Sequence, residues 1–328
     1  MLVGLALLAR VIGDATGVSP LLVAVGAGAL VGNLFTLPSA VDEGVALHSR
    51  LLNAGIVLLG ANVVVSELAA AGPVVLGLVA GVVAVGLPLG ELLGRRAGLA
   101  STPSSLLAAG ASVCGVSAAT TVAGVLDARA DDLAPVVAAI LVFDAVTLVA
   151  FPLVGDLLGL SARQFGVWAG LSMFSTGPVT AAGFAYGPVA GQWATVTKLA
   201  RNVLLGAVVL VYVLRLRGRD DGTAGGGTGD ADAHGARSRL GHLRAGIPPF
   251  VVGFLLLATA ASVGVLGDAA VALADRASTA LFTLAFVGLG LDIRVAGMRR
   301  VGASPLLALF GHLLVVSAVT LLVVLAVL

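Results

Sequence analysis

Charged residues are scarce in this chain. They make up 11% of its 328 residues, whereas a soluble domain carries about 25%. So few charges leave too little polar surface to cover a water-soluble globule of this size. Hydrophobic residues account for 59% of the chain, and the mean hydropathy is +1.12. The composition therefore excludes a soluble protein and indicates an integral membrane protein.

Cysteine is nearly absent as well. The single cysteine, Cys114, excludes an internal disulfide and supplies no set of metal ligands. The sequence also lacks the H-E-x-x-H, G-x-S-x-G and P-loop patterns that mark common catalytic sites. A net charge of +1 gives no indication of nucleic-acid binding. We therefore predict neither an enzyme nor a metal, cofactor or nucleic-acid partner.

What the sequence does have is a series of hydrophobic blocks. Most are long enough for an α-helix to cross roughly 30 Å of hydrocarbon. We predict an all-α, polytopic membrane protein of about eleven transmembrane helices. The expected spans are 2–16, 20–36, 51–66, 73–94, 104–126, 133–155, 164–186, 192–214, 247–266, 278–292 and 305–327.

The basic residues test this count. If the spans alternate in direction, thirteen of the 18 basic residues fall on the side that holds the N-terminus and three on the other. The remaining two, Lys198 and Arg201, lie within a span. Because basic residues favour the cytoplasmic side, we expect a multi-pass protein of the plasma membrane. Its N-terminus and the polar 217–244 loop would then be cytoplasmic.

That loop also organises the chain. Residues 217–245 are rich in Gly, Asp and Arg, a composition typical of a flexible loop. About eight spans precede it, in 1–216, and about three follow, in 246–328. We expect both parts to form one integral membrane domain.

Two stretches suggest an internal repeat. VLLGANVVVSELAAAG (57–72) aligns with VGLGLDIRVAGMRRVG (287–302), so that Gly60 matches Gly290 and Asn62 matches Asp292. In the predicted topology the two run in opposite directions, as in transporters built from inverted repeats. Alternatively, any short apolar span that ends in Gly and Asn or Asp would look similar.

One span is unusually poor in large side chains. GASVCGVSAATT (110–121) contains Gly110 and Gly115, which weaken a helix. A broken helix is tolerated at membrane depth only where it lines a cavity or is buried in protein. Its second half would present backbone N–H groups and a positive dipole end, which suit an anion. Close helix packing through small residues is the alternative. The candidate binding residues are Ser112, Cys114, Gly115 and Ser117.

A second stretch has the same character. In GLSMFSTGPVTAAG (170–183), Gly177-Pro178 removes a backbone donor and predicts a kink. Two interrupted spans with one intact span between them suggest a binding site where they meet. Here the candidate binding residues are Ser172, Ser175 and Thr176.

Charged residues inside predicted spans include Asp144, Lys198 and Arg201. Lys198 and Arg201 share a helix face with Asn202, and such charges face either a partner or a wet cavity. Alternatively, both could snorkel to the outer surface. Asp144 is mid-span, in ILVFDAVTL, where it could carry a proton or pair with one of the two cations.

These stretches resemble the YeiH-type conserved membrane proteins of bacteria and archaea, a family labelled as sulfate exporters. LLNAGIVLLGANV is similar to the family's L-L-R-L-G-I-V-L-L-G-F-R-L, and GASVCGVSAAT to its G-S-S-I-C-G-A-S-A-V-A. Further similar stretches follow in the family's order: QFGVWAG (164–170), TKLARNVLL (197–205), GIPPFVVGF (246–254) and GLGLDI (288–293). The resemblance covers nearly the whole chain. It implies a relationship to the cation/proton antiporter and anion transporter group, with inverted repeats and crossed, broken helices.

The chain also departs from that family. Where the family has S-I-H-E-V-A-Q-V-V-A-A-G, this chain reads SMFSTGPVTAAG, with Phe174 for the His and Ser175 for the Glu. Asp144 stands where the family tends to have a small residue. If the His-Glu pair couples protons in relatives, Asp144 is the candidate replacement here.

These features predict a secondary active transporter of a small inorganic or organic anion, with sulfate export as the expected case. It would work in the lipid bilayer by alternating access, coupled to H⁺ or Na⁺, and could form a homo-oligomer. The expected substrate-binding residues are Ser112, Cys114, Gly115, Ser117, Ser172, Ser175, Thr176, Lys198 and Arg201, with Asp144 for proton coupling. A cation/proton antiporter that uses Asp144 and a channel or non-transporting membrane protein stay open as alternatives.

Overall fold

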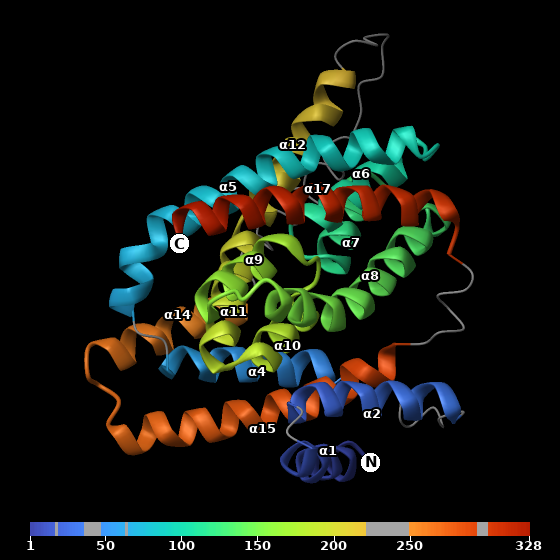
Figure 1. Ribbon diagram of the computed structural model, residues 1–328. Helices are drawn as coiled ribbons and strands as arrows, with labels where there is room; N and C mark the ends of the chain where they lie inside the picture. The colour runs from blue at the N-terminus through green and yellow to red at the C-terminus, as the bar shows by residue number, and fades with distance from the viewer. Residues whose placement is uncertain (17–18, 36–46, 63–64, 221–248, 294–300) are drawn as a thin grey trace, which may run out of the picture.

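Figure 1 shows the computed structural model, in which the described part of the chain folds into helices. The structure describes residues 1–16, 19–35, 47–62, 65–220, 249–293 and 301–328, except for the side chains of 14, 65–71 and 217–220. The all-helical prediction is confirmed for these residues. Most of the predicted 217–245 loop lies outside them, although helix continues to Asp220.

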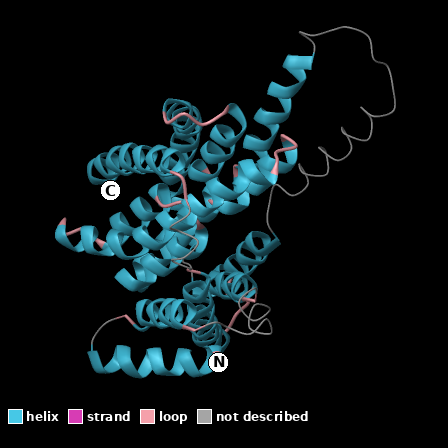
Figure 2. Cartoon of the chain, turned by 90° about the vertical axis from the view of Figure 1, so that its right-hand side faces the viewer, coloured by secondary structure: helices cyan, strands magenta, loops and turns pink. Residues whose placement is uncertain are grey.

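The helices form two groups, which Figures 1 and 2 show one above the other. We call the first the flanking bundle. It consists of α1 (Leu2–Thr16), α2 (Pro20–Leu34), α4 (His48–Leu59) with the short 3₁₀ helix η1 (Gly60–Asn62), α14 (Pro249–Ser262) and α15 (Asp268–Asp292).

We call the second group the crossover bundle, because its interrupted helices meet inside it. Its members are α5 (Val65–Arg96), α6 (Ser101–Ser112), α7 (Val116–Val125), α8 (Ala130–Leu157), α9 (Ala162–Ser172), α10 (Thr176–Tyr186), α11 (Pro188–Val203), α12 (Leu205–Asp220) and α17 (Ala303–Val327). The two bundles meet where α10 packs on α2 and α15, and where α5 packs on α14.

Membrane-spanning character is clear for part of the chain. Among the described residues, five helical segments are long and apolar enough to cross a membrane: Gly72–Arg96, Ala130–Leu157, Pro188–Leu216, Asp268–Asp292 and Ala303–Val327. Each overlaps a predicted span. The other predicted spans correspond to shorter helices or to pairs of half-helices, so the count of eleven stays a prediction.

Small residues hold the flanking bundle together. A Cβ atom added at Gly28 of α2 would overlap the backbone oxygen of Val287 of α15, and one at Gly290 would overlap that of Val25. Such close approach of backbones replaces hydrophobic burial as the source of packing within a membrane. Asn33 of α2 adds a side-chain hydrogen bond of 2.6 Å to the carbonyl oxygen of Ile293.

Both predicted interruptions are present in the crossover bundle. The first separates α6 from α7 at 113–115, where Gly115 has φ +69° and ψ −128°, a conformation that glycine adopts without strain. The second separates α9 from α10 at 173–175. The two breaks touch, because a Cβ atom at Gly115 would overlap the side chain of Ser175.

The second break lies upstream of the predicted position. Gly177-Pro178 does not kink a helix but belongs to the first turn of α10. The first N–H groups of a helix have no intrahelical partner, so a proline there sacrifices no hydrogen bond. The tenth predicted span also begins earlier, since α15 starts at Asp268 rather than at 278. Its additional turns are mostly exposed and carry Asp268, Asp275 and Arg276, and Asp275 accepts a hydrogen bond of 3.2 Å from Asn62.

Candidate functional site

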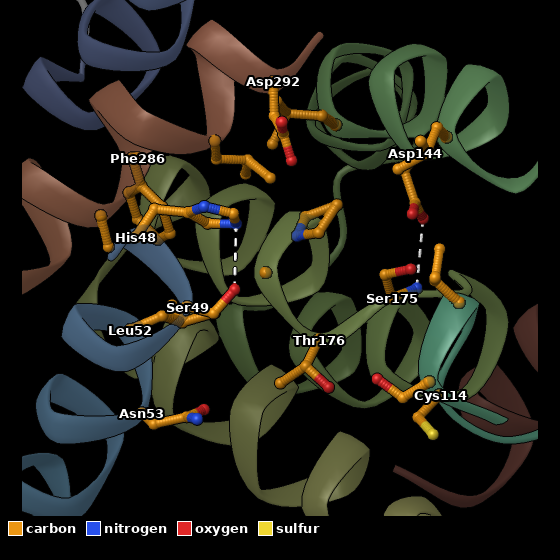
Figure 3. A pocket seen from close by; sticks show the side chains of 18 of the residues that line it. His48, Ser49, Leu52, Asn53, Cys114, Asp144, Ser175, Thr176, Phe286 and Asp292 are labelled. Carbon is orange, nitrogen blue, oxygen red and sulfur yellow. Dashed lines mark hydrogen bonds between the residues drawn. The ribbon is translucent and has the colours of Figure 1, made fainter. Parts of the chain in front are cut away.

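A cavity of about 440 Å³ lies between the two bundles. Figure 3 shows its polar side chains pointing inward from both walls. The crossover bundle contributes Cys114, Ser117, Asp144, Ser175, Thr176 and Asn202, and the flanking bundle contributes His48, Ser49, Asn53, Phe286 and Asp292. Because the two bundles share the cavity, a shift of one against the other would change its shape and access.

Two helices begin at this cavity. Val116, the first residue of α7, and Thr176, the first residue of α10, both line it. The first N–H groups of a helix point away from its body without partners and carry partial positive charge. Two such termini at one cavity provide backbone donors for a negatively charged group.

Two half-helices end behind the cavity, and buried cations neutralise them. Lys198 is fully buried, and its Nζ donates hydrogen bonds of 2.8 Å to the carbonyl oxygen of Val113 and 2.9 Å to that of Met173. Arg201 is also fully buried and donates over 2.7–3.2 Å to the carbonyl oxygens of Ala111, Ser112, Gly170, Leu171 and Met173. These carbonyl groups at the ends of α6 and α9 would otherwise lack partners, and cations there oppose the negative helix ends.

This arrangement decides between the two interpretations of the cations. Snorkelling to the outer surface is wrong, because neither side chain has any exposed area. Neither lines the cavity directly. Lys198 and Arg201 therefore contribute their charge from behind the helix breaks.

Asp144 approaches the cavity from α8. Its side chain is 4% exposed, and its Oδ1 accepts a hydrogen bond of 3.1 Å from the backbone N–H of Ser175, the residue that precedes α10. Figure 3 shows this bond as a dashed line. Among the described residues, Asp144 forms no ion pair with Lys198 or Arg201, so the alternative of direct pairing with one of these cations is wrong. The carboxylate instead occupies the N-terminus of a half-helix.

Asn202 connects the end of α11 to the start of α10. Its amide nitrogen donates a hydrogen bond of 3.1 Å to the hydroxyl of Thr176. Its Oδ1 is buried and has no hydrogen-bond partner within the described part of the chain. Buried polar atoms are rarely left unpaired, so this amide is a candidate contact for a ligand.

The predicted binding residues divide into two sets. Cys114, Ser117, Ser175 and Thr176 line the cavity, whereas Ser112, Gly115, Ser172, Lys198 and Arg201 do not. Ser172 is instead paired with Thr320 of α17 at 2.8 Å, which makes it a packing contact of the crossover bundle. Gly115 shapes the break, and the carbonyl oxygen of Ser112 binds Arg201.

The sequence analysis missed the opposite wall. His48, Ser49 and Asn53 come from α4, and Phe286 and Asp292 come from α15. The sequence signal for this wall was weak. Its polar residues lie at the edges of two apolar stretches, and one of these residues, Asp292, is aligned with Asn62 in the suggested repeat. Their convergence depends on how the flanking bundle packs on the crossover bundle.

These features define a class: a multi-pass, α-helical membrane protein with interrupted helices around a cavity that polar and apolar side chains line. The chain belongs to the UPF0324 membrane protein family. The family model described as "Conserved hypothetical protein 698" matches residues 1–309. A UPF0324 membrane protein of Corynebacterium glutamicum is 32% identical over 93% of this chain and 85% of its own length.

Two other relatives match the chain over a similar share of its length. A UPF0324 membrane protein of Agrobacterium fabrum is 30% identical over 88% of this chain and 78% of its own length. The UPF0324 membrane protein TauZ of Paracoccus denitrificans is 31% identical over 91% of this chain and 85% of its own length. No solved structure matches the chain. These names state no substrate and no antiporter relationship, so sulfate export and that relationship stay predictions.

Proposed function

We propose that this protein is a secondary transporter of a small anion that works by alternating access. The observation that carries the proposal is the charge balance where the interrupted helices meet. Each helix terminus carries about half an elementary charge, so the two N-termini and the two C-termini cancel. Among the described residues, the buried Lys198 and Arg201 then stand against one buried carboxylate, that of Asp144, whereas Asp292 on the opposite wall is exposed. The excess positive charge behind the cavity favours an anion within it.

The cavity suits a small anion in its dimensions and chemistry. Its volume of about 440 Å³ exceeds that of one tetrahedral oxyanion, so sulfate or a small organic acid fits with some water. Donors are available from the α7 and α10 N-termini and from the hydroxyls of Ser117 and Thr176. Sulfate export remains the expected case from the family resemblance, and other small anions share its chemistry.

The two bundles supply a mechanism for movement. In the predicted orientation, His48 and Asp292 lie at the cytoplasmic ends of their spans, and both line the cavity. The cavity would then open to the cytoplasm in this conformation. A displacement of the flanking bundle against the crossover bundle would close that route and open the other, as in carriers with discontinuous helices at their binding site.

A cation/proton antiporter is the second candidate, because Asp144 is a carboxylate on the cavity wall. Against it, the carboxylate already accepts an N–H, and both neighbouring half-helices present positive ends. Among the described residues, no group of three His, Cys, Asp or Glu is placed to hold a metal ion. The flux experiment below separates the two candidates.

The test is anion flux in proteoliposomes, with radiolabelled sulfate, nitrate, chloride and acetate, each with and without a pH gradient. We expect saturable, gradient-coupled flux of at least one anion. Lys198→Gln should lower the rate at least tenfold, equivalent to about 1.4 kcal/mol, because it removes the excess charge. The matched control is Arg215→Gln, which removes a half-exposed charge paired with Glu91 away from the cavity and should stay within about twofold.

If Lys198→Gln does not fold, Thr176→Val replaces it. This change keeps the side-chain shape, removes a cavity hydroxyl and should raise the half-saturating anion concentration. If the folded protein carries no anion but exchanges Na⁺ for H⁺, the antiporter becomes the better explanation and the anion carrier is rejected. Flux that is neither saturable nor coupled to a gradient would indicate a channel.

A further inference from the structure

We propose that Asp144 is a built-in occupant of the anion site, and that its protonation admits the substrate, so that one proton travels with each anion. The inference rests on the proposed anion carrier and specifies its coupling. It assigns Asp144 a role as a competitor of the substrate, and it predicts symport of the anion with H⁺.

The position of the carboxylate carries the first step. An external anion at the α10 N-terminus would seek the same backbone donors that Asp144 reaches, through Ser175 N–H, from the adjacent helix α8. With Asp144 ionised, the first of these donors is in use. A second anion beside the carboxylate would also meet a like charge in a poorly screened environment. The ionised state therefore excludes the substrate.

Asn202 provides an independent sign of a ligand at this terminus. It is 4% exposed, lines the cavity, and leaves Oδ1 without a partner among the described residues. Because the two ends of an amide are interchangeable by rotation, Thr176 could donate to Oδ1 while the amide nitrogen turns toward an anion. The wall beside the carboxylate thus holds a polar group with unused hydrogen-bonding capacity.

Protonation reverses these conditions. A neutral Asp144 releases Ser175 N–H, gains an O–H donor, and leaves Lys198 and Arg201 without a buried counter-charge in the part of the chain that the structure describes. The other titratable groups around the cavity are Cys114 at the first break, His48 on α4 and Asp292 on α15, and Asp292 is exposed. None of these accepts the Ser175 N–H, so the competition belongs to Asp144.

The cycle is balanced in atoms and charge. An Asp144 oxygen takes one proton from the aqueous phase on the loading side as the anion enters, which forms an O–H bond. That bond breaks after the bundles move, and the proton leaves with the anion on the other side. A monovalent anion then moves with no net charge, whereas a divalent anion moves one negative charge.

Cys114 is a native reporter for this step, because it is the only cysteine and lines the cavity. We would measure its alkylation by N-ethylmaleimide in proteoliposomes, with and without nitrate, chloride and sulfate, which stay ionised throughout. The ratio of the two rates at each pH cancels the thiol's own pH dependence. Cys114→Ala establishes that the label reports this residue.

In the wild type, we expect the half-protecting anion concentration to rise up to tenfold per pH unit where Asp144 is ionised. Asp144→Asn mimics the neutral form. Its half-protecting anion concentration should be independent of pH and equal to that of the wild type at low pH. It should also exchange labelled anion but lose accumulation driven by a pH gradient. Asp156→Asn, the same change at an exposed position of α8, should behave like the wild type.

Each other outcome overturns a distinct statement. Protection that is equally independent of pH in wild type and Asp144→Asn would overturn the coupling and leave the anion carrier intact. If Asp144→Asn is only less stable and its anion protection keeps the wild-type pH dependence, then Asp144 acts only as a helix cap. No protection by any anion, in folded protein without anion flux, would overturn the carrier and the coupling with it.

Discussion

At the scale of single residues, Arg201 shows how a buried charge can serve the backbone. Its guanidinium group contacts five carbonyl oxygens of two half-helices. The sequence left open whether this cation is buried against a partner or a cavity or snorkels to the outer surface. It could not identify the partners, which lie about 30 and 90 residues earlier in the chain and are backbone groups without a sequence signature.

Replacement of Arg201 should therefore destabilise the fold strongly. We expect Arg201→Met to cost about 3–5 kcal/mol, because it leaves buried carbonyl groups without donors. Arg201→Lys should cost less, because an ammonium group keeps the charge but has three donors instead of five. Thermal unfolding in detergent measures the order. Arg95→Met, at the exposed end of α5, is the control, and equal melting temperatures for all three variants would contradict this role.

At the scale of helices, the two interruptions and a site between them were predictable, but the residues that bring the breaks into contact were not. Gly110, Gly115 and the Ser/Thr content indicate a weak helix locally, so the sequence located the first break well. The second break was placed too late, since a proline in the first turn is compatible with a helix. That Gly115 meets Ser175 is a tertiary contact between segments sixty residues apart.

Gly115→Ala tests that contact. The alanine must adopt φ +69°, ψ −128°, and its Cβ would overlap Ser175. Gly98→Ala is the matched control, because Gly98 has φ +87° and nothing within 4 Å of an added Cβ. We expect Gly98→Ala to cost about 1 kcal/mol of backbone strain without changing anion affinity. Gly115→Ala should cost more and weaken anion protection of Cys114. Identical effects of both variants would show that the contact between the breaks is unimportant.

At the scale of the whole molecule, the cavity exists only because two bundles face each other. Local patterns predicted the crossover wall, since Cys114, Ser117, Ser175 and Thr176 belong to the interrupted stretches themselves. The flanking wall was missed, because His48 and Asp292 reach the cavity only through the packing of α4 and α15. Alternating access requires the two bundles to move at this shared boundary. A cross-link across the boundary therefore tests the mechanism directly.

The ring centroids of Phe184 in α10 and Phe282 in α15 lie 5.1 Å apart across that boundary, and neither residue lines the cavity. We expect Phe184→Cys/Phe282→Cys, in a Cys114→Ala background, to be joined by a short bis-methanethiosulfonate linker. Joining the bundles should abolish net anion flux, and reduction should restore it, because the restraint blocks movement rather than chemistry. Each single cysteine variant treated in the same way should keep its flux. Full flux in the linked protein would mean that the anion crosses without relative movement of the bundles, as in a channel.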